Sequence, residues 1–370
     1  MIKLEQVSRV FPGSEVPAVV DLTMTIGDGE VCVLVGPSGC GKTTTMKMIN
    51  RLIDPTSGKI YVNDQDTSKI DPIALRLGIG YVIQEIGLFP HMTIAENVAT
   101  VPREKGWPRD RINQRVDELM HLVGLNPGTY RNRLPADLSG GQRQRVGVAR
   151  AMAADPPILL MDEPFGAVDP ITRARLQNEF LRLQEQMKKT IVFVTHDIDE
   201  AIKMGDRIAV MRDGRLVQYE EPDKLLSMPA DDFVATLVGR NRSIKRLHLI
   251  KVNDVVQNET PFVTPEASVD EIRSAMEERK TNTVLVVNAV NKLQGVISRA
   301  ELKGVEGARA AQIAQPVQNT VEWGATLNDA LAVMLNYGER YVAVVNSREE
   351  LKGVITLNYL LDLVRDDAAA

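Results

Sequence analysis

The chain has 370 residues, which at roughly 150 residues per domain predicts two or three domains. Its 44 basic and 49 acidic residues give a net charge of −5, which excludes a general electrostatic attraction to nucleic acid or to an anionic membrane. Two cysteines, Cys32 and Cys40, are too few for a disulfide framework and indicate a reducing compartment. No apolar run approaches the roughly 20 residues that span a bilayer, so we expect any function in a membrane to require a partner protein.

Short apolar runs alternate with helical patterns from residue 2 to about residue 235. We expect strands at 31–35, 158–161, 191–195 and 207–211, and helices at 42–52, 109–123, 141–154 and 172–188. This alternation predicts an α/β domain with a mainly parallel sheet. Each expected strand ends where a polar or glycine-rich segment begins, and ligands of such sheets bind beyond the carboxyl ends of the strands.

A phosphate-loop pattern follows the first of these strands and precedes a helix, which is the context that phosphate binding requires. The glycines let backbone N–H groups turn toward phosphate oxygens, Lys42 would reach the β and γ phosphates, and the Thr43 hydroxyl would bind Mg²⁺. A glycine-rich turn without a ligand is the alternative. The residues that we expect to contact the nucleotide are Gly36, Pro37, Ser38, Gly39, Cys40, Gly41, Lys42, Thr43 and Thr44.

The strand at 158–161 delivers two adjacent carboxylates, Asp162 and Glu163. Side chains alternate along a strand, so the two cannot serve the same purpose. We expect Asp162 to hold the Mg²⁺ ion and Glu163 to polarise the water that attacks the γ-phosphorus. The sequence Asp-Glu-Pro is also typical of a turn at the end of a strand, and this segment taken alone does not distinguish a turn from a catalytic site.

Residues 138–142 have the sequence Leu-Ser-Gly-Gly-Gln, and the serine of this motif, Ser139, lies 23 residues before Asp162. With this motif, residues 1 to about 235 resemble the nucleotide-binding subunit of ABC transporters. Other family elements occur in the expected order, namely Gln84 of the Q-loop, 166–169 of the D-loop, and His196 after the strand at 191–195.

The resemblance implies a P-loop ATPase with a helical subdomain, working as a homodimer that sandwiches two ATP molecules. The signature residues Ser139, Gly140, Gly141 and Gln142 of one subunit would close over the γ-phosphate bound by the other subunit, and Asp169 would bind the nucleotide at the same interface. A dimer is then required for catalysis.

The resemblance also assigns further roles. His196 would contact the γ-phosphate and orient water with Glu163, Gln84 would join Thr43 and Asp162 at the metal, and Phe11 would stack on adenine. Core packing is the alternative for Phe11. The expected catalytic residues are Glu163, His196, Lys42 and Gln84, and the cofactors are ATP and Mg²⁺.

Cys40 lies inside the expected phosphate loop, whereas Cys32 lies in a strand. Because an empty loop would be open to solvent, we expect thiol reagents to modify Cys40 and ATP to protect it. Cys32 is expected to be buried and inert.

The stretch after Gln84 contains Leu88, Phe89 and Met92. In the family this region receives a coupling helix from the permease, and these side chains would form the apolar patch that grips it; packing in the core is the alternative. By the resemblance the chain lies at the cytoplasmic face of the membrane, bound to permease subunits and served indirectly by an extracytoplasmic solute-binding protein, with no nucleic-acid partner.

The sequences next to the motifs, at 46–52, 89–92 and 169–173, resemble those of the ATPases of importers for glycine betaine, choline or carnitine. The substrate class rests on this resemblance alone, because an ATPase does not touch the transported solute. An importer of another solute and a soluble ABC ATPase for DNA repair or translation are the alternatives. A repair protein would carry a long insertion between Lys42 and Ser139, and translation factors carry two cassettes, whereas this chain has one.

Residues 240–251 contain five basic residues and no acidic one, and beyond them the sequence repeats itself with an offset of 58 positions. The Gly-Val-Ile at 295–297, for example, recurs at 353–355. We therefore expect an ATPase domain at 1–239, a basic linker at 240–251, and two repeats at 252–310 and 311–370 that pack together. The duplicated part resembles a tandem CBS pair of the α+β class, the regulatory attachment of many osmoprotectant-importer ATPases.

CBS pairs bind adenine nucleotides or cyclic di-AMP in the cleft between their copies, or respond to ionic strength. Adenosine-binding copies place an Asp three residues after a Ser or Thr, but here Glu301 follows Ser298 and Tyr359 follows Thr356. This departure argues against AMP or ATP and leaves cyclic di-AMP, a salt-sensing role, or a structural brace. The basic run could contact lipid in a salt-dependent way, or remain a solvated linker.

Overall fold

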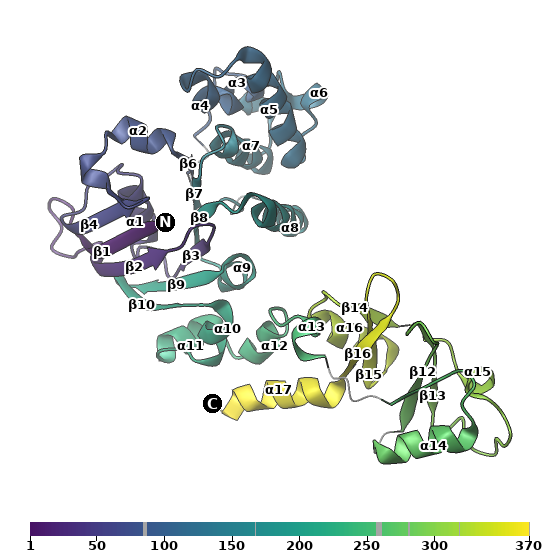
Figure 1. Cartoon of the computed structure of the whole chain (residues 1–370). Helices are drawn as coiled ribbons and strands as arrows, with labels where there is room; N and C mark the ends of the chain where they lie inside the picture. Colours follow the sequence, from purple (N-terminus) through teal and green to yellow (C-terminus); the bar gives the residue numbers. More distant parts are fainter. Residues whose placement is uncertain (84–86, 167, 257–260, 280–281, 318, 370) are drawn as a thin grey trace. The chain divides into compact units, whose positions relative to one another are not determined.

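The computed structural model describes residues 1–83, 87–166, 168–256, 261–279, 282–317 and 319–369 (Figure 1). The chain divides into two compact units. The first comprises Met1–Leu225 and Pro229–Val238, and the second comprises Leu226–Met228 and Gly239–Ala370. No helix of the described residues has the length and apolar character that crossing a membrane requires.

A six-stranded sheet forms the centre of the first unit, in the order β10-β9-β3-β8-β7-β6. All neighbours pair in parallel except β10, which joins β9 as an antiparallel edge. The expected parallel α/β sheet is thus present. Its strands are β3 (Val31–Val35), β6 (Ile79–Val82), β7 (Ile158–Asp162), β8 (Thr190–Thr195), β9 (Arg207–Arg212) and β10 (Arg215–Glu220).

A second, antiparallel sheet in the order β2-β1-β4-β5 lies against the first sheet, and the sequence analysis did not predict it. In β2 the buried Val19, Leu22, Met24 and Ile26 follow the alternation of a half-buried strand. They share one core with Leu34 and its neighbours from the parallel sheet. The strands are β1 (Ile2–Arg9), β2 (Val19–Ile26), β4 (Ser57–Val62) and β5 (Gln65–Asp66).

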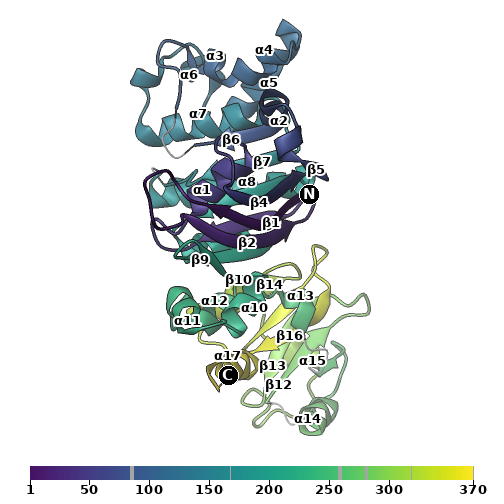
Figure 2. The same ribbon diagram turned by 90° about the vertical axis from the view of Figure 1, so that its left-hand side faces the viewer.

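Helices complete the first unit in two groups. The group from α3 to α7 stands at one end, away from β1 and β2 (Figures 1 and 2), and matches the helical subdomain that the resemblance implied. It consists of α3 (Ile94–Val98), α4 (Thr100–Glu104), α5 (Arg109–Leu122), α6 (Pro127–Tyr130), the short η2 (Pro135–Asp137) and α7 (Gly140–Met152). The others are α1 (Lys42–Ile49), η1 (Thr67–Lys69), α2 (Pro72–Leu77), α8 (Pro170–Met187), α9 (Ile198–Met204) and α11 (Asp232–Val238), with α10 (Pro222–Ser227) at the division between units.

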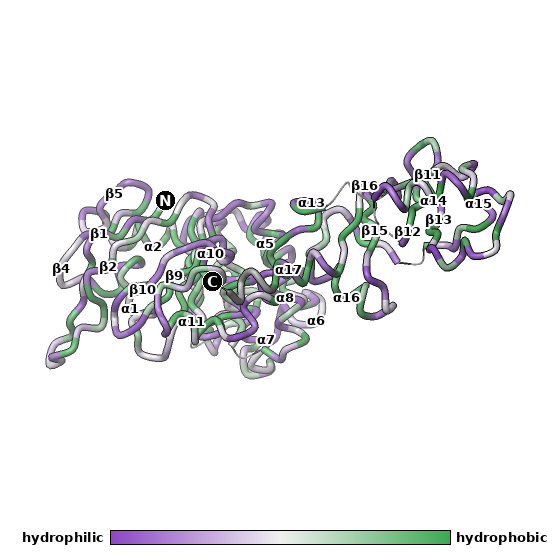
Figure 3. The backbone as a smooth tube through the Cα atoms, turned by 90° about the horizontal axis from the view of Figure 1, so that it is seen from below, coloured by the Kyte–Doolittle hydropathy of each residue, from purple (hydrophilic) through white to green (hydrophobic). Residues whose placement is uncertain are grey.

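Two three-stranded sheets with the same pairing form the second unit, as the sequence repeat predicts. Val284 pairs with Ile297 in the first sheet, and Val342, 58 positions later, pairs with Ile355 in the second. The first sheet contains β11 (Phe262–Val263), β12 (Thr283–Val287) and β13 (Leu293–Ser298), and the second contains β14 (Thr320–Glu322), β15 (Tyr341–Val345) and β16 (Leu351–Thr356). Figure 3 shows that hydrophobic stretches follow these strands, whereas the loops between them are largely hydrophilic.

The helices of this unit are α12 (Arg242–Arg246), α13 (Val252–Val255), α14 (Val269–Glu278), α15 (Ala310–Ile313), α16 (Leu327–Tyr337) and α17 (Leu357–Ala369). The two repeats pack through buried side chains of both, including Leu285 and Val287 of β12 and Ala343 and Val354 of the second repeat. Neither repeat therefore holds a complete core alone.

The repeats also exchange their first segments. Val252, at the start of the first repeat, is fully buried in the core of the second, and its N–H donates to the carbonyl of Ala325 at 2.8 Å. At the start of the second repeat the N–H of Ala311 donates to the carbonyl of Pro265 at 2.9 Å, and Ile313 and Ala314 pack against the core of the first repeat. The expected boundaries at 252 and 310–311 were drawn from the sequence repeat. In the structure, residues at the start of each repeat pack in or against the core of the other repeat.

The segment 240–251, expected as a solvated linker, is folded into the second unit. It contains α12, and Leu247 is 1% exposed in the core around Val321 and Leu327. The N–H of Asn328 donates to the carbonyl of Leu247 at 3.0 Å. The structure differs from the expectation because the apolar residues between the cations have a core to enter.

Candidate functional site

The phosphate loop joins the end of β3 to the start of α1, and its glycines are needed for close backbone packing. A Cβ on Gly36 would stand 2.1 Å from the carbonyl oxygen of Met211, and one on Gly41 would stand 2.5 Å from that of Ala18. Gly36 and Gly41 have positive φ angles of 150° and 101°. Side chains at these two positions would push the loop off the sheet.

Lys42 begins α1 and folds back into the loop. Its Nζ donates to the carbonyl oxygens of Gly36 at 2.7 Å and Pro37 at 2.8 Å, and the residue is only 7% exposed. The ammonium group is therefore held at the centre of the loop, with Thr43 and Thr44 following it in the first turn of the helix. This is the arrangement that a phosphate loop needs.

The thiol of Cys40 does not face the ligand side of the loop, contrary to our expectation. Cys40 is 4% exposed and belongs to the core beneath the loop, with its Sγ 3.6 Å from Nζ of Lys42. Cys32 is fully buried, as expected, and burial raises the pKa of its thiol. The exposed positions of the loop are Pro37, Ser38 and Gly39, whereas Cys40 is turned inward, so the thiol lacks the solvent access on which the expected reagent sensitivity rested.

Thr43 and Asp162 meet at the expected metal position. The Thr43 hydroxyl donates to Oδ1 of Asp162 at 3.2 Å, and Asp162 is 2% exposed at the end of β7. Burial raises the pKa of Asp162, the hydrogen bond from Thr43 opposes this rise, and the charge of Glu163 adds to it. Gln84, the third expected ligand, lies outside the described residues.

This donor set fits a magnesium ion. Mg²⁺ in nucleotide sites is held by one or two protein carboxylates or hydroxyls together with substrate phosphates, not by an all-protein cage. Among the described residues no group of three or more His, Cys, Asp and Glu side chains is placed to hold a metal. A buried carboxylate with a raised pKa beside a hydroxyl is a position where a cation would be favourable.

Glu163 and His196 come together from two neighbouring strands. Nδ1 of His196 lies 3.0 Å from Oε1 of Glu163, and His196 directly follows β8. Glu163 adopts a φ of 47°, uncommon for a residue with a side chain, and its N–H donates to the carbonyl of Val194 at 3.0 Å. Asp197, next in sequence, caps α9 and fixes the turn that carries His196.

Gln144 is a site residue that sequence reasoning missed. It lies in α7, is 2% exposed, and its Nε2 donates to the carbonyl of Glu163 at 3.3 Å. The signature helix thus holds the backbone of the expected general base within one subunit. No sequence signal identified Gln144, because its role depends on two segments meeting in space.

The signature residues form the start of α7 and stand apart from the phosphate loop of their own chain. Ser139 and Gln142 make reciprocal capping hydrogen bonds, and Nε2 of Gln142 donates to the hydroxyl of Tyr130 at 3.2 Å. Gly140 and Gly141 lie between them, and a Cβ on Gly140 would meet nothing within 4 Å. Within the described part of the chain, no hydrogen bond or ion pair joins this group to residues 36–44.

The two remaining site residues lie on the surface. Asp169 caps α8 through a hydrogen bond from the N–H of Thr172 at 3.0 Å, beside Ala167, which lies outside the described residues. Phe11 is 39% exposed, and the guanidinium of Arg9 lies 4.9 Å from its ring centroid. Phe11 is therefore not a core residue, and its ring is open to a ligand.

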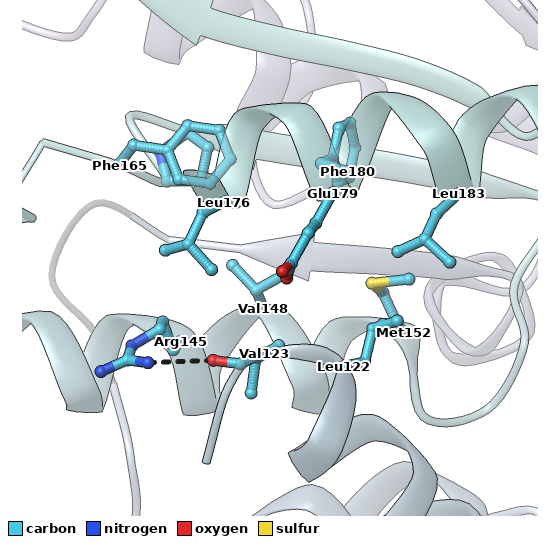
Figure 4. Close-up of a pocket in the computed structure, with 11 residues that line it drawn as sticks. Leu122, Val123, Arg145, Val148, Met152, Phe165, Leu176, Glu179, Phe180 and Leu183 are labelled. Atoms are coloured by element: carbon cyan, nitrogen blue, oxygen red, sulfur yellow. Dashed lines mark hydrogen bonds between the residues drawn. The ribbon is translucent and has the colours of Figure 1, made fainter. Parts of the chain in front are cut away.

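Apolar side chains pack between α7, the signature helix, and α8, the helix that follows Asp162 and Glu163. Leu176 and Leu183 of α8 point toward α7, which contributes Val148 and Met152 to the same small cavity (Figure 4). Arg145 closes one end, with Nη1 donating to the carbonyl of Val123 at 3.1 Å. Burial lowers the pKa of Arg145, and the nearby Arg175 adds to this effect.

A parallel sheet with a phosphate loop, a buried aspartate at the metal position, a Glu–His pair and a signature helix on a separate helical subdomain defines an ABC-type ATPase. Comparisons with known proteins agree. The ABC transporter family model matches residues 19–166, and the CBS domain model matches residues 252–305 and 324–366. A solved structure titled as the dimeric post-hydrolysis state of the ATP-binding cassette MJ0796 bound to ADP and Pi shares 35% identity, with a TM-score of 0.57 over 60% of this chain and 99% of that chain.

Full-length relatives are also similar. The osmoprotectant import ATP-binding protein OsmV of Salmonella typhimurium is 45% identical over 98% of this chain and 96% of its own length. The glycine betaine/carnitine/choline transport ATP-binding protein OpuCA of Bacillus subtilis is 45% identical over 99% of this chain and 97% of its own. The chain belongs to the ABC transporter family, among the ATP-binding proteins of osmoprotectant import systems that carry a CBS pair, and the resemblance drawn from the motifs is confirmed.

Proposed function

We propose that this chain hydrolyses ATP to drive import of an osmoprotectant of the quaternary amine type through separate permease subunits. The observation that carries the ATPase assignment is the contact of 3.0 Å between His196 and Glu163, beside the Asp162–Thr43 pair. The solute class rests on the relatives, which are named for glycine betaine, carnitine and choline transport. The relatives are named as ATP-binding proteins of transport systems, which supports a permeation path in other subunits and a position of this chain on the cytoplasmic side of the membrane.

In this proposal each residue of the site has one task. Lys42 exchanges its contacts with the Gly36 and Pro37 carbonyls for phosphate oxygens, and Glu163 accepts the proton of the attacking water. His196 fixes the Glu163 carboxylate and faces the γ-phosphate. Thr43 and Asp162, with Gln84, would hold Mg²⁺, which neutralises charge on the β and γ phosphates.

The signature residues act on a second copy of the chain. Ser139 and the Gly140 amide are open at the start of α7 and have no contact with their own phosphate loop among the described residues. A helix N-terminus favours a negative charge, which here would be the γ-phosphate held by the partner. Phe11 would stack on adenine, and Asp169 would complete the interface between the subunits.

The permease contact is proposed at the segment containing Leu88, Phe89 and Met92. Phe89 is 40% exposed, and Leu88 and Met92 are half-buried, so the patch is not absorbed by the core. Arg150 from α7 lies 6.0 Å from the Phe89 ring and donates to the carbonyl of Gly87 at 2.7 Å. A force applied to the patch would therefore reach the signature helix.

The cleft between the repeats is the position where the resemblance places cyclic di-AMP. It has a volume of about 380 Å³ and is lined by Glu301, Glu339 and Tyr341 among others, but by no Lys or Arg of the described residues. A phosphodiester would meet two carboxylates there, so we expect cyclic di-AMP to bind weakly in this cleft. Equilibrium dialysis of the ligand against the full chain measures this directly.

The ATPase proposal is tested by Glu163→Gln in the full chain. Binding of ATP should be retained, because Glu163 is not part of the phosphate loop, while hydrolysis should fall at least about a hundredfold for loss of the general base. The variant should also accumulate as an ATP-bound dimer in size-exclusion chromatography. Glu185→Gln, an exposed neighbour on α8, is the matched control and should hydrolyse normally. Near-normal hydrolysis by Glu163→Gln would contradict the proposal.

The transport proposal is tested by purification from the native membrane. Multi-span permease subunits and a solute-binding protein should co-purify with the chain, and Phe89→Ser should weaken this association without changing basal hydrolysis. Recovery of the chain without membrane proteins would instead support a soluble ABC ATPase.

A further inference from the structure

The helical faces of the two repeats have diverged in charge. Arg273 of the first repeat corresponds, 58 positions later, to Leu331 of the second. In the same way Arg299 corresponds to Leu357, and Lys303 corresponds to Leu361. The second repeat therefore shows that this fold accepts leucine at all three positions, and that the cations of the first repeat are not required by the fold.

These three cations surround one pocket of about 230 Å³. Arg273 comes from α14, whereas Arg299 and Lys303 come from the turn that follows β13, so two separate segments converge. The floor is apolar and well packed, because Met276 is fully buried and Leu302 is 2% exposed. Nη2 of Arg273 donates to the carbonyl of Leu302 at 3.2 Å, which holds the guanidinium at the wall.

The backbone that follows the last strand of each repeat also differs. After β16 of the second repeat the chain continues as the 13-residue helix α17, visible in Figure 1, and Leu360 of that helix is buried. After β13 the chain makes only a turn, and Gly304 has a φ of +72°. A left-handed glycine ends a helix. The segment therefore stops after one turn, and Gly304 lines the pocket.

The charges of the pocket are not balanced by the protein. Within the described ranges Arg299 and Lys303 form no ion pair, and Arg273 has only the exposed Asp270 at 3.7 Å. Glu277 is the one carboxylate in the described lining, so three cations face one anion. Lys292 and Lys352 of the same unit, in contrast, are paired with Glu349 at 2.7 Å and Glu350 at 3.1 Å.

We propose that this pocket, walled by Arg273, Arg299 and Lys303, binds a phosphate-bearing anion. Arginine recognises phosphate through paired N–H donors, and lysine adds a point charge. The pocket is distinct from the cleft between the repeats, whose described lining has two carboxylates and no cation. The phosphate could belong to a soluble ester or to a phospholipid headgroup, since both present the same group.

The test uses the full chain with a saturating non-hydrolysable ATP analogue, so that the phosphate loop is filled. One arm measures binding of inorganic pyrophosphate by calorimetry, and the other measures sedimentation with phosphatidylcholine vesicles with and without phosphatidylglycerol. The pocket variant is Arg299→Gln with Lys303→Gln. The control is Arg279→Gln with Arg348→Gln, two exposed arginines of the same unit that change the net charge equally.

We expect the pocket variant to lose at least about tenfold in affinity for one probe, while the control binds as the unchanged chain does. Loss of pyrophosphate binding assigns a soluble phosphate, and loss of binding to the phosphatidylglycerol vesicles assigns a lipid headgroup. Equal weakening by both variants would mean general surface charge and would overturn the proposal, as would failure of the unchanged chain to bind either probe. All four side chains are exposed, and thermal unfolding confirms that the variants are folded.

Discussion

At the scale of single residues, the site is a set of side chains held by backbone contacts from other elements. Glu163 is fixed on three sides: its N–H bonds to Val194, its carbonyl accepts from Gln144, and its carboxylate meets His196. A residue at a positive φ persists only where its surroundings impose the conformation. Catalytic geometry here is therefore a property of the neighbours of Glu163 as well as of Glu163 itself.

Gln144→Ala tests this positioning role. Loss of one hydrogen bond worth about 1 kcal/mol should lower kcat by roughly fivefold, because the carbonyl and the carboxylate of Glu163 move together. The KM for ATP should stay the same, because Gln144 does not touch the phosphate loop. A control, Gln142→Ala, should act through dimer formation instead and show a changed dependence on protein concentration. If KM rose while kcat was unchanged, Gln144 would be a binding residue.

Asp162 provides a prediction about pH. Because burial raises its pKa above the value in the unfolded chain, the ionised carboxylate destabilises the fold when no cation is bound. This penalty is absent below the unfolded pKa of 3.8 and is complete once the pH exceeds the raised pKa. We therefore expect Asp162→Asn to raise the unfolding temperature of the nucleotide-free chain at pH 7 and to abolish metal-dependent hydrolysis. An unchanged or lower unfolding temperature at pH 7 would contradict this account.

At the scale of elements, one buried asparagine shapes the segment proposed to face the permease. Asn97 of α3 is fully buried, and its Oδ1 accepts from the N–H of Phe89 at 2.8 Å. Its Nδ2 donates to the carbonyls of Phe89, Met92 and Thr93 at 3.0–3.1 Å. Asn97 therefore ties the exposed patch to the helical subdomain, together with Arg150 of α7.

Asn97→Ala should release this segment. The buried groups left without partners should lower the free energy of unfolding by about 1–3 kcal/mol, which denaturant titration measures. Stimulation of hydrolysis by the permease should fall further than the basal rate. Asn97→Asp keeps the acceptor for Phe89 but puts a carboxylate oxygen in place of the Nδ2 donor, opposite three buried carbonyls, so it should lower both quantities at least as far. If the alanine variant kept full stability and stimulation, the segment would be held by other contacts.

At the scale of the whole molecule, the second unit is a duplication whose parts cannot be separated. Val252 lies in the core of the second repeat, and Ile313 and Ala314 of the second repeat pack against the core of the first. Each repeat therefore needs the other for its own core, in addition to the apolar contact between their sheets. A ligand that changed the angle between the repeats would also disturb both cores.

Val252→Asp tests the exchange. An unpaired charge in the core of the second repeat should destabilise the second unit by about 3 kcal/mol or more. Val290→Asp, in a loop of the first repeat with the side chain 67% exposed, should change stability by less than about 0.5 kcal/mol. Calorimetry separates the transitions of the two units, and that of the ATPase unit should not move. Equal effects of the two substitutions would show that Val252 is not a core residue.

The expected site chemistry and the local elements could be predicted from the order of the amino acids. The glycines of 36–41, the acidic end of β7 and the start of α7 are specified by neighbouring residues, because phosphate loops, strand ends and helix caps are local structures. The repeat of 58 residues likewise predicted identical strand pairing, since equal patterns form equal sheets. These features needed no knowledge of distant contacts.

Contacts between distant segments could be established only from the folded structure. Whether Cys40 faces the ligand or the core, whether Gln144 meets Glu163, and which repeat buries Val252 all depend on pairs of segments far apart in sequence. The antiparallel sheet was missed for a related reason, because its strands gain their stability from pairing across long separations. The charge of residues 240–251 predicted a solvated linker. The segment is folded instead, because the hydrophobic gain from burying Leu247 in a core formed by distant residues exceeds the cost of ordering the charged segment.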